Sequence, residues 1–141
     1  MKKTAFVTGA TSGFGEAIAR RLSQEGYKIV ALARREDRLK KLASELGDTH
    51  IIVADIRDKK AVFDAVDSLP DKFKDIEVLV NNAGLALGQE KTIDAKVDDF
   101  ETMIDTNVKG LIYSTKAVLP LLYKQKKGYI FNLGSTAGSW P

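Results

Sequence analysis

Residues 8–15 have the composition of a loop that binds phosphate groups. Their three glycines have the spacing Gly-x3-Gly-x-Gly, directly after an apolar run and directly before a helical pattern. Gly9 allows a tight turn off a strand, Gly13 lets the backbone approach a pyrophosphate, and Gly15 lets the helix pack closely on a sheet. The N-terminus of that helix would present free N–H groups and a partial positive charge to the phosphates. We therefore expect a dinucleotide to be bound by Gly9, Thr11, Ser12, Gly13, Phe14 and Gly15.

Two arginines at the end of the second apolar run bear on which dinucleotide is bound. In a sheet of this type the end of the second strand meets the adenosine ribose, where an acidic residue favours NAD and a basic residue favours NADP. A guanidinium matches phosphate oxygens in a bidentate geometry, so we expect Arg34 and Arg35 to bind the 2′-phosphate of NADP. Two alternatives remain at this point. In the first, Arg34 and Arg35 only begin a charged helix and do not contact a cofactor. In the second, Glu36 or Asp37 accepts a hydrogen bond from the ribose 2′-hydroxyl, as in proteins that bind NAD.

A carboxylate follows the third apolar run, in the sequence Val-Ala-Asp55-Ile56. At the end of that strand Asp55 can accept a hydrogen bond from the adenine amino group, and we expect Ile56 to lie against the same part of the cofactor. The alternative is that Asp55 caps the next turn of the chain, and one carboxylate can serve both purposes.

Five short apolar runs, with helical patterns between them, would position these residues. The runs show little alternation, which is typical of strands buried on both faces of a parallel sheet. The alternation of strand and helix predicts an α/β fold, a doubly wound parallel sheet in one domain over residues 1–141. With the glycine loop after the first strand we expect the Rossmann type of this sheet, which has strand order 3-2-1-4-5. The expected strands are residues 4–8, 28–33, 51–54, 78–80 and 129–133.

The longest helical pattern runs from about residue 98 to residue 127 and is unusually apolar. Its apolar residues form more than one stripe, so we expect it to be covered by further protein or by a partner subunit. The sequence thus predicts a homo-oligomer formed through residues 98–127.

The composition excludes several other classes of protein. The 141 residues have a formal net charge of +3, and their basic residues are interspersed with acidic ones, so we expect no nucleic-acid partner. The absence of cysteine excludes disulfides and thiolate metal sites and favours a cytoplasmic protein. The single histidine, His50, cannot form a zinc cluster or a histidine-based triad alone, and we expect no metal site. No apolar stretch is long enough to span a membrane, so we expect no membrane partner.

Three further motifs complete a pattern that spans the chain. They are Asn81-Asn82-Ala83-Gly84, Asp105-Thr106-Asn107-Val108-Lys109-Gly110 and Gly134-Ser135-Thr136-Ala137-Gly138. Together with the glycine loop, and in this order, they resemble the short-chain dehydrogenase/reductase family. Residues 79–88 and 134–141 resemble one subgroup of it, the NADP-dependent 3-hydroxy acid dehydrogenases or serine 3-dehydrogenases. That resemblance implies a small-molecule substrate, a short 3-hydroxy acid such as serine, with NADP as the hydride acceptor.

The resemblance also implies roles for individual residues. Ser135 would hydrogen-bond the reacting oxygen of the substrate, and Asn107 would lie at a local break in the long helix and hold a water of a proton relay. Asn82, Ala83 and Gly84 would line the nicotinamide ribose and brace the sheet. The alternatives are that Asn107 caps the helix that begins at residue 108 and that Ser135 is an ordinary turn serine.

The family's general acid/base is a tyrosine in a Tyr-x-x-x-Lys pair, which would follow Ser135 by about a dozen residues. The printed sequence ends at Pro141, and we do not expect Tyr123 or Tyr129 to take that role. We therefore expect this chain to be the N-terminal part of an oxidoreductase, lacking the C-terminal third of the family fold and inactive alone.

Two other functions remain as alternatives at this point. A non-catalytic module could bind the dinucleotide through the same glycine loop. A methyltransferase that uses S-adenosylmethionine also has a glycine loop after its first strand. Such an enzyme usually needs an acidic residue at the end of the second strand, where this chain has Arg34 and Arg35.

Overall fold

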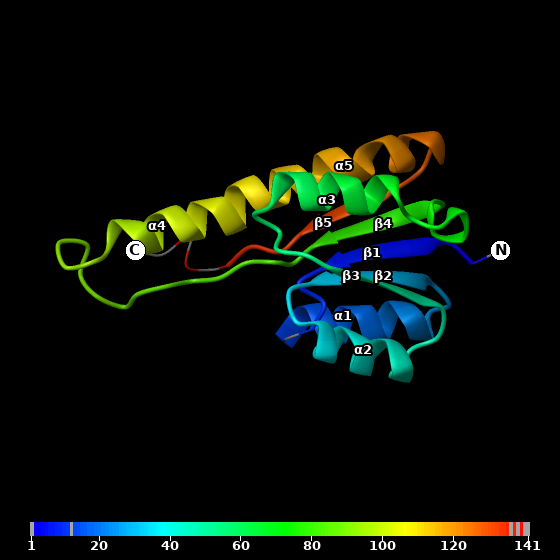
Figure 1. Cartoon of the computed structure of the whole chain (residues 1–141), viewed down its shortest axis with the longest axis horizontal. Helices are drawn as coiled ribbons and strands as arrows, with labels where there is room; N and C mark the ends of the chain where they lie inside the picture. The colour runs from blue at the N-terminus through cyan, green and yellow to red at the C-terminus, as the bar shows by residue number, and fades with distance from the viewer. Residues whose placement is uncertain (1, 12, 136, 138, 140–141) are drawn as a thin grey trace.

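A five-stranded parallel sheet with helices on both faces forms the chain (Figure 1). The structure is a computed structural model, and it describes residues 2–11, 13–135, 137 and 139. The strand order β3-β2-β1-β4-β5 confirms the predicted topology. The strands are β1 (Thr4–Thr8), β2 (Lys28–Ala33), β3 (Thr49–Val53), β4 (Ile76–Asn81) and β5 (Tyr129–Asn132).

The helices divide between the two faces of the sheet, as Figure 1 shows. One face carries α1 (Gly13–Gln24) and α2 (Glu36–Glu45). The other carries α3 (Lys59–Asp67) and the long helix, which consists of α4 (Val97–Ile104), a π-helical segment η2 (Asp105–Gly110) and α5 (Leu111–Lys124). A short 3-10 helix, η1 (Asp71–Phe73), precedes β4.

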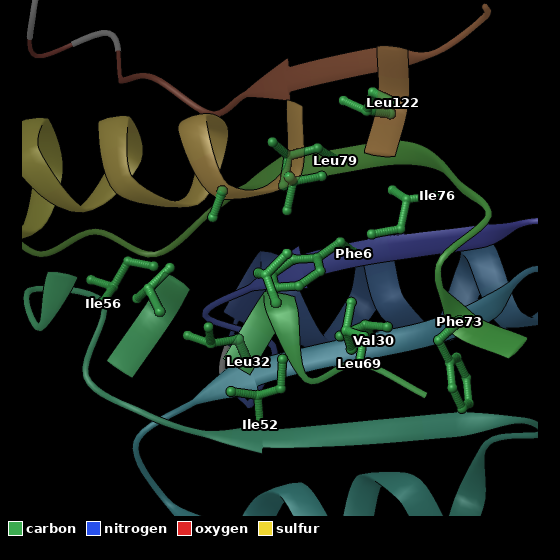
Figure 2. Packing of buried hydrophobic residues seen from close by; sticks show 14 residues of the cluster. Phe6, Val30, Leu32, Ile52, Ile56, Leu69, Phe73, Ile76, Leu79 and Leu122 are labelled. Atoms are coloured by element: carbon green, nitrogen blue, oxygen red, sulfur yellow. The ribbon is translucent and has the colours of Figure 1, made fainter. Parts of the chain in front are cut away.

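The pattern of buried residues explains why the central strands are apolar without alternation. Every residue of β1 is buried, and successive side chains enter different layers, with Phe6 on the α3 and α5 face and Ala5 and Val7 on the α1 and α2 face. Because helices cover both faces, both sets of side chains must be apolar. Figure 2 shows the larger layer, whose labelled members include Phe6, Val30, Leu32, Leu79 and Leu122.

The edge strand β5 differs from the expected burial on both faces. All four of its residues are exposed, and Phe131 retains 53% of its accessible surface. The sheet order places β5 at the edge, and no helix in the described part of the chain covers the face of β5 that lies beside α1. None of the helices in the described residues has the length and apolar character needed to span a membrane.

At the amino-terminal edge of the sheet, a half-buried ion pair contributes to stability. Lys28 Nζ lies 2.9 Å from Asp75 Oδ1, to which the Thr4 hydroxyl donates a hydrogen bond of 2.8 Å. Burial alone would raise the pKa of Asp75, but the hydrogen bonds from Lys28 and Thr4 outweigh it and hold the pKa below its usual value. The carboxylate therefore stabilises the folded state at neutral pH, and this contribution is lost as the pH falls through the folded-state pKa.

Asp75→Asn is expected to lower the free energy of unfolding at pH 7 by about 1–2 kcal/mol, because Lys28 loses a charged partner. Urea denaturation at a series of pH values measures the loss, which should shrink below about pH 4 as the wild-type carboxylate becomes protonated. Asp71→Asn is the matched control, because Asp71 is fully exposed and its pair with Lys74 has a separation of 3.4 Å. A loss that stays constant down to pH 2.5 would show that the charge of Asp75 is not the cause.

Candidate cofactor-binding site

The glycine loop connects β1 to α1 at the carboxyl edge of the sheet. Gly9 has a positive φ of 63°, and a Cβ there would lie 2.8 Å from Asn82 Nδ2. A Cβ on Gly15 would lie 2.1 Å from the carbonyl oxygen of Gly9 and 2.3 Å from Asn82 Nδ2. Gly13 also has a positive φ, 53°, but no atom within 4 Å of a Cβ built on it. Gly9 and Gly15 are therefore needed for close packing between the loop and its neighbours. Gly13 is instead favoured by its positive φ, and its Cβ position is open. Ser12 lies outside the described residues.

Hydrogen bonds from the neighbouring strand hold this loop in place. The buried hydroxyl of Thr8 accepts from the backbone N–H groups of Asn82 at 3.1 Å and Ala83 at 3.0 Å. The side-chain amide of Asn82 donates to the carbonyl oxygen of Gly9 at 3.0 Å. Asn82 and Ala83 thus brace the loop, and their expected contact with the nicotinamide ribose stays a prediction. Thr8 was not predicted as a site residue, although a polar residue that ends an apolar strand is a signal for it.

Thr8→Val is expected to destabilise the chain by about 2 kcal/mol, because two partly buried N–H groups lose their acceptor while the shape is conserved. Urea denaturation measures the change. The matched control is Thr49→Val, because the Thr49 hydroxyl only donates to the Gly47 carbonyl oxygen at an exposed site and should contribute under about 0.5 kcal/mol. Equal stability of the Thr8→Val chain and the wild type would show that the hydrogen bonds between Thr8 and residues 82 and 83 do not stabilise the loop.

A cleft of about 130 Å³ opens beside the loop, between the carboxyl ends of β1, β2, β3 and β4. Ligand pockets usually measure about 300–1,000 Å³, so this cleft fits one end of a dinucleotide rather than all of it. Gly13, Phe14, Gly15, Asn82, Asn107 and Ser135 are outside its lining. The expected site residues that it does bring together are Gly9, Thr11, Arg34, Arg35, Asp55, Ile56, Ala83 and Gly84.

The two arginines line the cleft and the two acidic residues that follow them do not. Arg35 immediately precedes α2 in an extended conformation and does not cap it with its side chain. Glu36 lies on the surface of α2, where its carboxylate forms an ion pair of 2.9 Å with Lys40 Nζ. The geometry therefore favours the arginines over Glu36 and Asp37 as the groups that meet a ligand at the end of β2.

Asp55 lines the same cleft but is already paired with an arginine that was not predicted. Arg57 Nε lies 3.1 Å from both carboxylate oxygens, and Arg57 Nη2 lies 2.7 Å from Oδ2. This bond to Arg57 is the main reason that the pKa of Asp55 lies below its usual value, although partial burial opposes it. Asp55 also accepts from the backbone N–H of Arg57, while Asp58 caps α3 by accepting from the N–H of Ala61 at 3.0 Å. Asp55 thus orders the turn before α3 without capping that helix.

Asn107 lies in the π-helical segment η2, so the expected break in the long helix is present. Its side-chain oxygen accepts from the N–H of Leu85 at 2.9 Å, and its amide donates to the carbonyl oxygen of Leu85 at 2.7 Å. A Cβ on Gly84 would lie only 3.2 Å from the Asn107 side chain, which explains the glycine there. The alternative that Asn107 caps the following helix is wrong. Helix α5 begins only at Leu111, and the side-chain amide of Asn107 is bonded to Leu85. Its role in a proton relay stays a prediction.

Ser135 follows β5 in an exposed turn, where its hydroxyl accepts from the N–H of Ala137 at 3.1 Å. This contact is what a turn serine makes, and a catalytic role stays a prediction. Tyr123 and Lys127 have the Tyr-x-x-x-Lys spacing. Tyr123 lies in the last turn of α5 and Lys127 lies between α5 and β5, so both lie at the edge of the sheet opposite the glycine loop.

A buried polar network joins the ends of β4 and β5 to α5. The side chain of Asn81 accepts from the Ser114 hydroxyl at 2.6 Å and donates to Thr115 Oγ1 and Asn132 Oδ1, both at 2.9 Å. The hydroxyl of Thr106 in η2 is buried without a partner among the described residues. None of these contacts was predicted, because single polar residues in a helix or a strand give no sequence signal of their tertiary partners.

Comparisons with known proteins agree with this geometry. A family model described as short chain dehydrogenase matches residues 3–141. NADP-dependent 3-hydroxy acid dehydrogenase YdfG of Escherichia coli (strain K12) is 54% identical over 136 residues, which cover 96% of this chain and 55% of that protein. Serine 3-dehydrogenase of Agrobacterium fabrum is 49% identical over 142 residues, covering 100% of this chain and 57% of that protein. The closed form of serine dehydrogenase complexed with NADP+ has a TM-score of 0.94 at 52% identity, covering 98% of this chain and 56% of that chain. The chain therefore spans little more than half the length of these relatives.

Proposed function

The chain belongs to the short chain dehydrogenase family, and we propose on this premise that its 141 residues form the NADP-binding part of an oxidoreductase. The observation that carries the proposal is the cleft beside the glycine loop, which Arg34 and Arg35 line while Glu36 and Asp37 do not. Two guanidinium groups at the end of β2 suit the 2′-phosphate that distinguishes NADP from NAD. The relatives named for NADP support the same choice.

The glycine loop fits the pyrophosphate of such a cofactor. Gly9 and Gly15 leave room only for hydrogen atoms where the loop meets Asn82, and Gly13 leaves its backbone uncovered at the start of α1. The N–H groups in the first turn of α1 would donate to the phosphate oxygens. NADP, when bound, would supply a nicotinamide ring that accepts a hydride.

For the whole protein we propose that the substrate is a short 3-hydroxy acid such as serine. The support is the 49–55% identity to proteins named for 3-hydroxy acids and for serine. Ser135 would donate a hydrogen bond to the substrate oxygen, and Asn107 would hold a water near it. We also propose that the 141 residues alone do not oxidise serine, because Tyr123 and Lys127 lie at the opposite edge of the sheet from the glycine loop. NADPH absorbance after incubation of the mass-verified chain with L-serine and NADP+ tests this, and sustained turnover would overturn it.

A binding titration tests the cofactor assignment directly. The chain, with its mass verified, is titrated with NADPH, NADH and S-adenosylmethionine by calorimetry. We expect NADPH to bind at least about tenfold more tightly than NADH, since one charge-assisted phosphate contact contributes about 1.5–3 kcal/mol, and S-adenosylmethionine not to bind. Equal or tighter binding of NADH would contradict the role of the arginines, and binding of no dinucleotide would contradict the proposed function.

We further propose that the long helix mediates self-association. Phe100, Ile104, Val108 and Ile112 recur every four residues along it and are each at least 39% exposed. The first part of this helix carries Asp98, Asp99 and Glu101, whereas its last part carries Lys116 and Lys124. A two-fold axis that pairs two such helices antiparallel would join the apolar stripes and bring opposite charges together.

The substitution Ile104→Glu is expected to convert a self-associating chain to a monomer, because it places a charge in the middle of the stripe. Light scattering coupled to gel filtration measures the mass. Lys60→Glu on the exposed side of α3 is the control for added negative charge and should leave the mass unchanged. A wild-type chain that is monomeric at all concentrations tested would contradict the association.

A further inference from the structure

A third guanidinium in the cleft, that of Arg57, has no part in the function proposed so far. We propose that Arg57 determines cofactor specificity by neutralising Asp55, so that the cleft accepts a 2′-phosphate. This inference rests on the proposed binding of NADP. Arg57 is thus a positioning residue that acts through Asp55 and does not itself hold the phosphate.

The geometry of the pair supports this role. Three N–H groups of Arg57, two from the side chain and one from the backbone, reach the carboxylate within 3.1 Å. A carboxylate has about four lone-pair positions, so Arg57 leaves roughly one acceptor position for a ligand. That position is sufficient for a single bond from an adenine amino group.

The balance of charge in the cleft supports it as well. The cationic lining residues are Arg34, Arg35 and Arg57, and the one acidic residue among the described lining is Asp55. Their sum is +2, which matches the charge of about −1.5 to −2 on a phosphate monoester. Without Arg57 the sum would be +1, and the carboxylate of Asp55 would face the phosphate uncompensated. The charge of Arg34 also lowers the pKa of Asp55, by less than the bonds from Arg57 do.

The charge of Asp105 in η2 also helps to hold the pKa of Arg57 above its usual value, after the stronger effect of Asp55. Asp105 forms an ion pair of 2.8 Å with Lys109, so its own charge is compensated. Asp55 is therefore the carboxylate whose neutralisation depends on Arg57.

The experiment compares two small ligands that need only the adenosine end of the site, 2′,5′-ADP and 5′-AMP. The 141-residue chain is titrated with each, and the readout is the ratio of the two affinities. Arg57→Gln is expected to lower the preference for 2′,5′-ADP about tenfold, because the carboxylate of Asp55 is then uncompensated and repels the 2′-phosphate. Lys60→Gln, which removes one charge from an exposed ion pair of α3, is the matched control and should leave the ratio unchanged.

Two further variants separate an effect through Asp55 from a direct contact with phosphate. The double variant Asp55→Asn with Arg57→Gln should return the ratio to within about threefold of wild type, because the repelling charge is gone. Arg57→Lys loses the paired bonds but keeps the positive charge beside Asp55, and since the effect is one of charge the ratio should also stay within about threefold. Circular dichroism and thermal unfolding confirm that each variant is folded, and Arg57→Lys tests the proposal should Arg57→Gln fail to fold.

The outcomes that overturn the inference differ from those that overturn the proposed function. A wild-type preference for 2′,5′-ADP that Arg57→Gln leaves intact overturns the inference alone. A double variant whose ratio stays as low as that of Arg57→Gln shows a direct contact and also overturns it. A wild-type chain that binds both ligands equally, or neither, overturns the assignment of NADP and the inference with it.

Discussion

Gly15→Ala is expected to destabilise the chain by about 3 kcal/mol and to reduce NADPH binding below detection. The added methyl group would lie 2.1 Å from the Gly9 carbonyl oxygen and 2.3 Å from Asn82 Nδ2. The backbone oxygen cannot move without breaking the bond that Asn82 donates to it. The start of α1 must therefore shift away from the strands, which displaces the N–H groups that would hold the pyrophosphate.

Urea denaturation and a calorimetric titration with NADPH measure the two effects. Gly47→Ala is the matched control, because a Cβ at Gly47 meets only the Ser23 hydroxyl at 3.9 Å and its backbone is not in the left-handed region. That variant should change stability by less than about 0.5 kcal/mol and leave binding intact. A Gly15→Ala chain with wild-type stability and affinity would show that the start of α1 accommodates a Cβ at residue 15 without a clash.

The double variant Arg34→Gln with Arg35→Gln is expected to weaken NADPH binding about 100-fold and NADH binding less than threefold. Each guanidinium would give a charge-assisted contact with the 2′-phosphate, worth about 1.5–3 kcal/mol. NADH lacks this phosphate, so its affinity should depend on the glycine loop and the adenine contacts alone. Loss of the preference for NADPH, rather than loss of binding as a whole, is the specific result.

Calorimetric titration at constant ionic strength measures both affinities. Arg21→Gln is the control for removal of a surface arginine, because Arg21 pairs with Glu25 on the exposed side of α1. It should leave both affinities within about twofold. An equal loss for NADPH and NADH in the double variant would assign the arginines to a general electrostatic role instead of to the 2′-phosphate.

Much of the fold could be predicted because its signals are local. Unbroken apolar runs indicate strands between two helix layers, and the alternation of strands and helices indicates a doubly wound parallel sheet. The strand order follows from the Rossmann type of the sheet, which the glycine loop indicates. Gly9 and Gly15 could be predicted as contacts of the loop because only glycine allows such close approach. The exposure of β5 could not be predicted from its apolar residues, since burial depends on what covers the sheet edge.

The candidate site was predicted in part. Arg34, Arg35 and Asp55 end apolar strands, and the carboxyl ends of parallel strands meet at one edge of the sheet. Arg57 was missed because a charged residue in a turn is usually solvated, and only the folded turn brings its guanidinium back onto Asp55. Thr8 was missed because its partners, which directly follow β4, are more than 70 residues away in the sequence. Such partners depend on tertiary structure and leave no periodic signal.

The brace between Thr8, Gly9 and Asn82 has a consequence for the order of events in folding. Its hydrogen bonds join residues separated by 73 to 75 positions, across the whole of β2, α2, β3 and α3. Contacts this far apart carry a large loop-closure cost and form slowly. The glycine loop therefore reaches its final shape only after β4 has docked beside β1. In a nascent chain, the ability to bind a phosphate group would arise late, once about the first 83 residues have assembled.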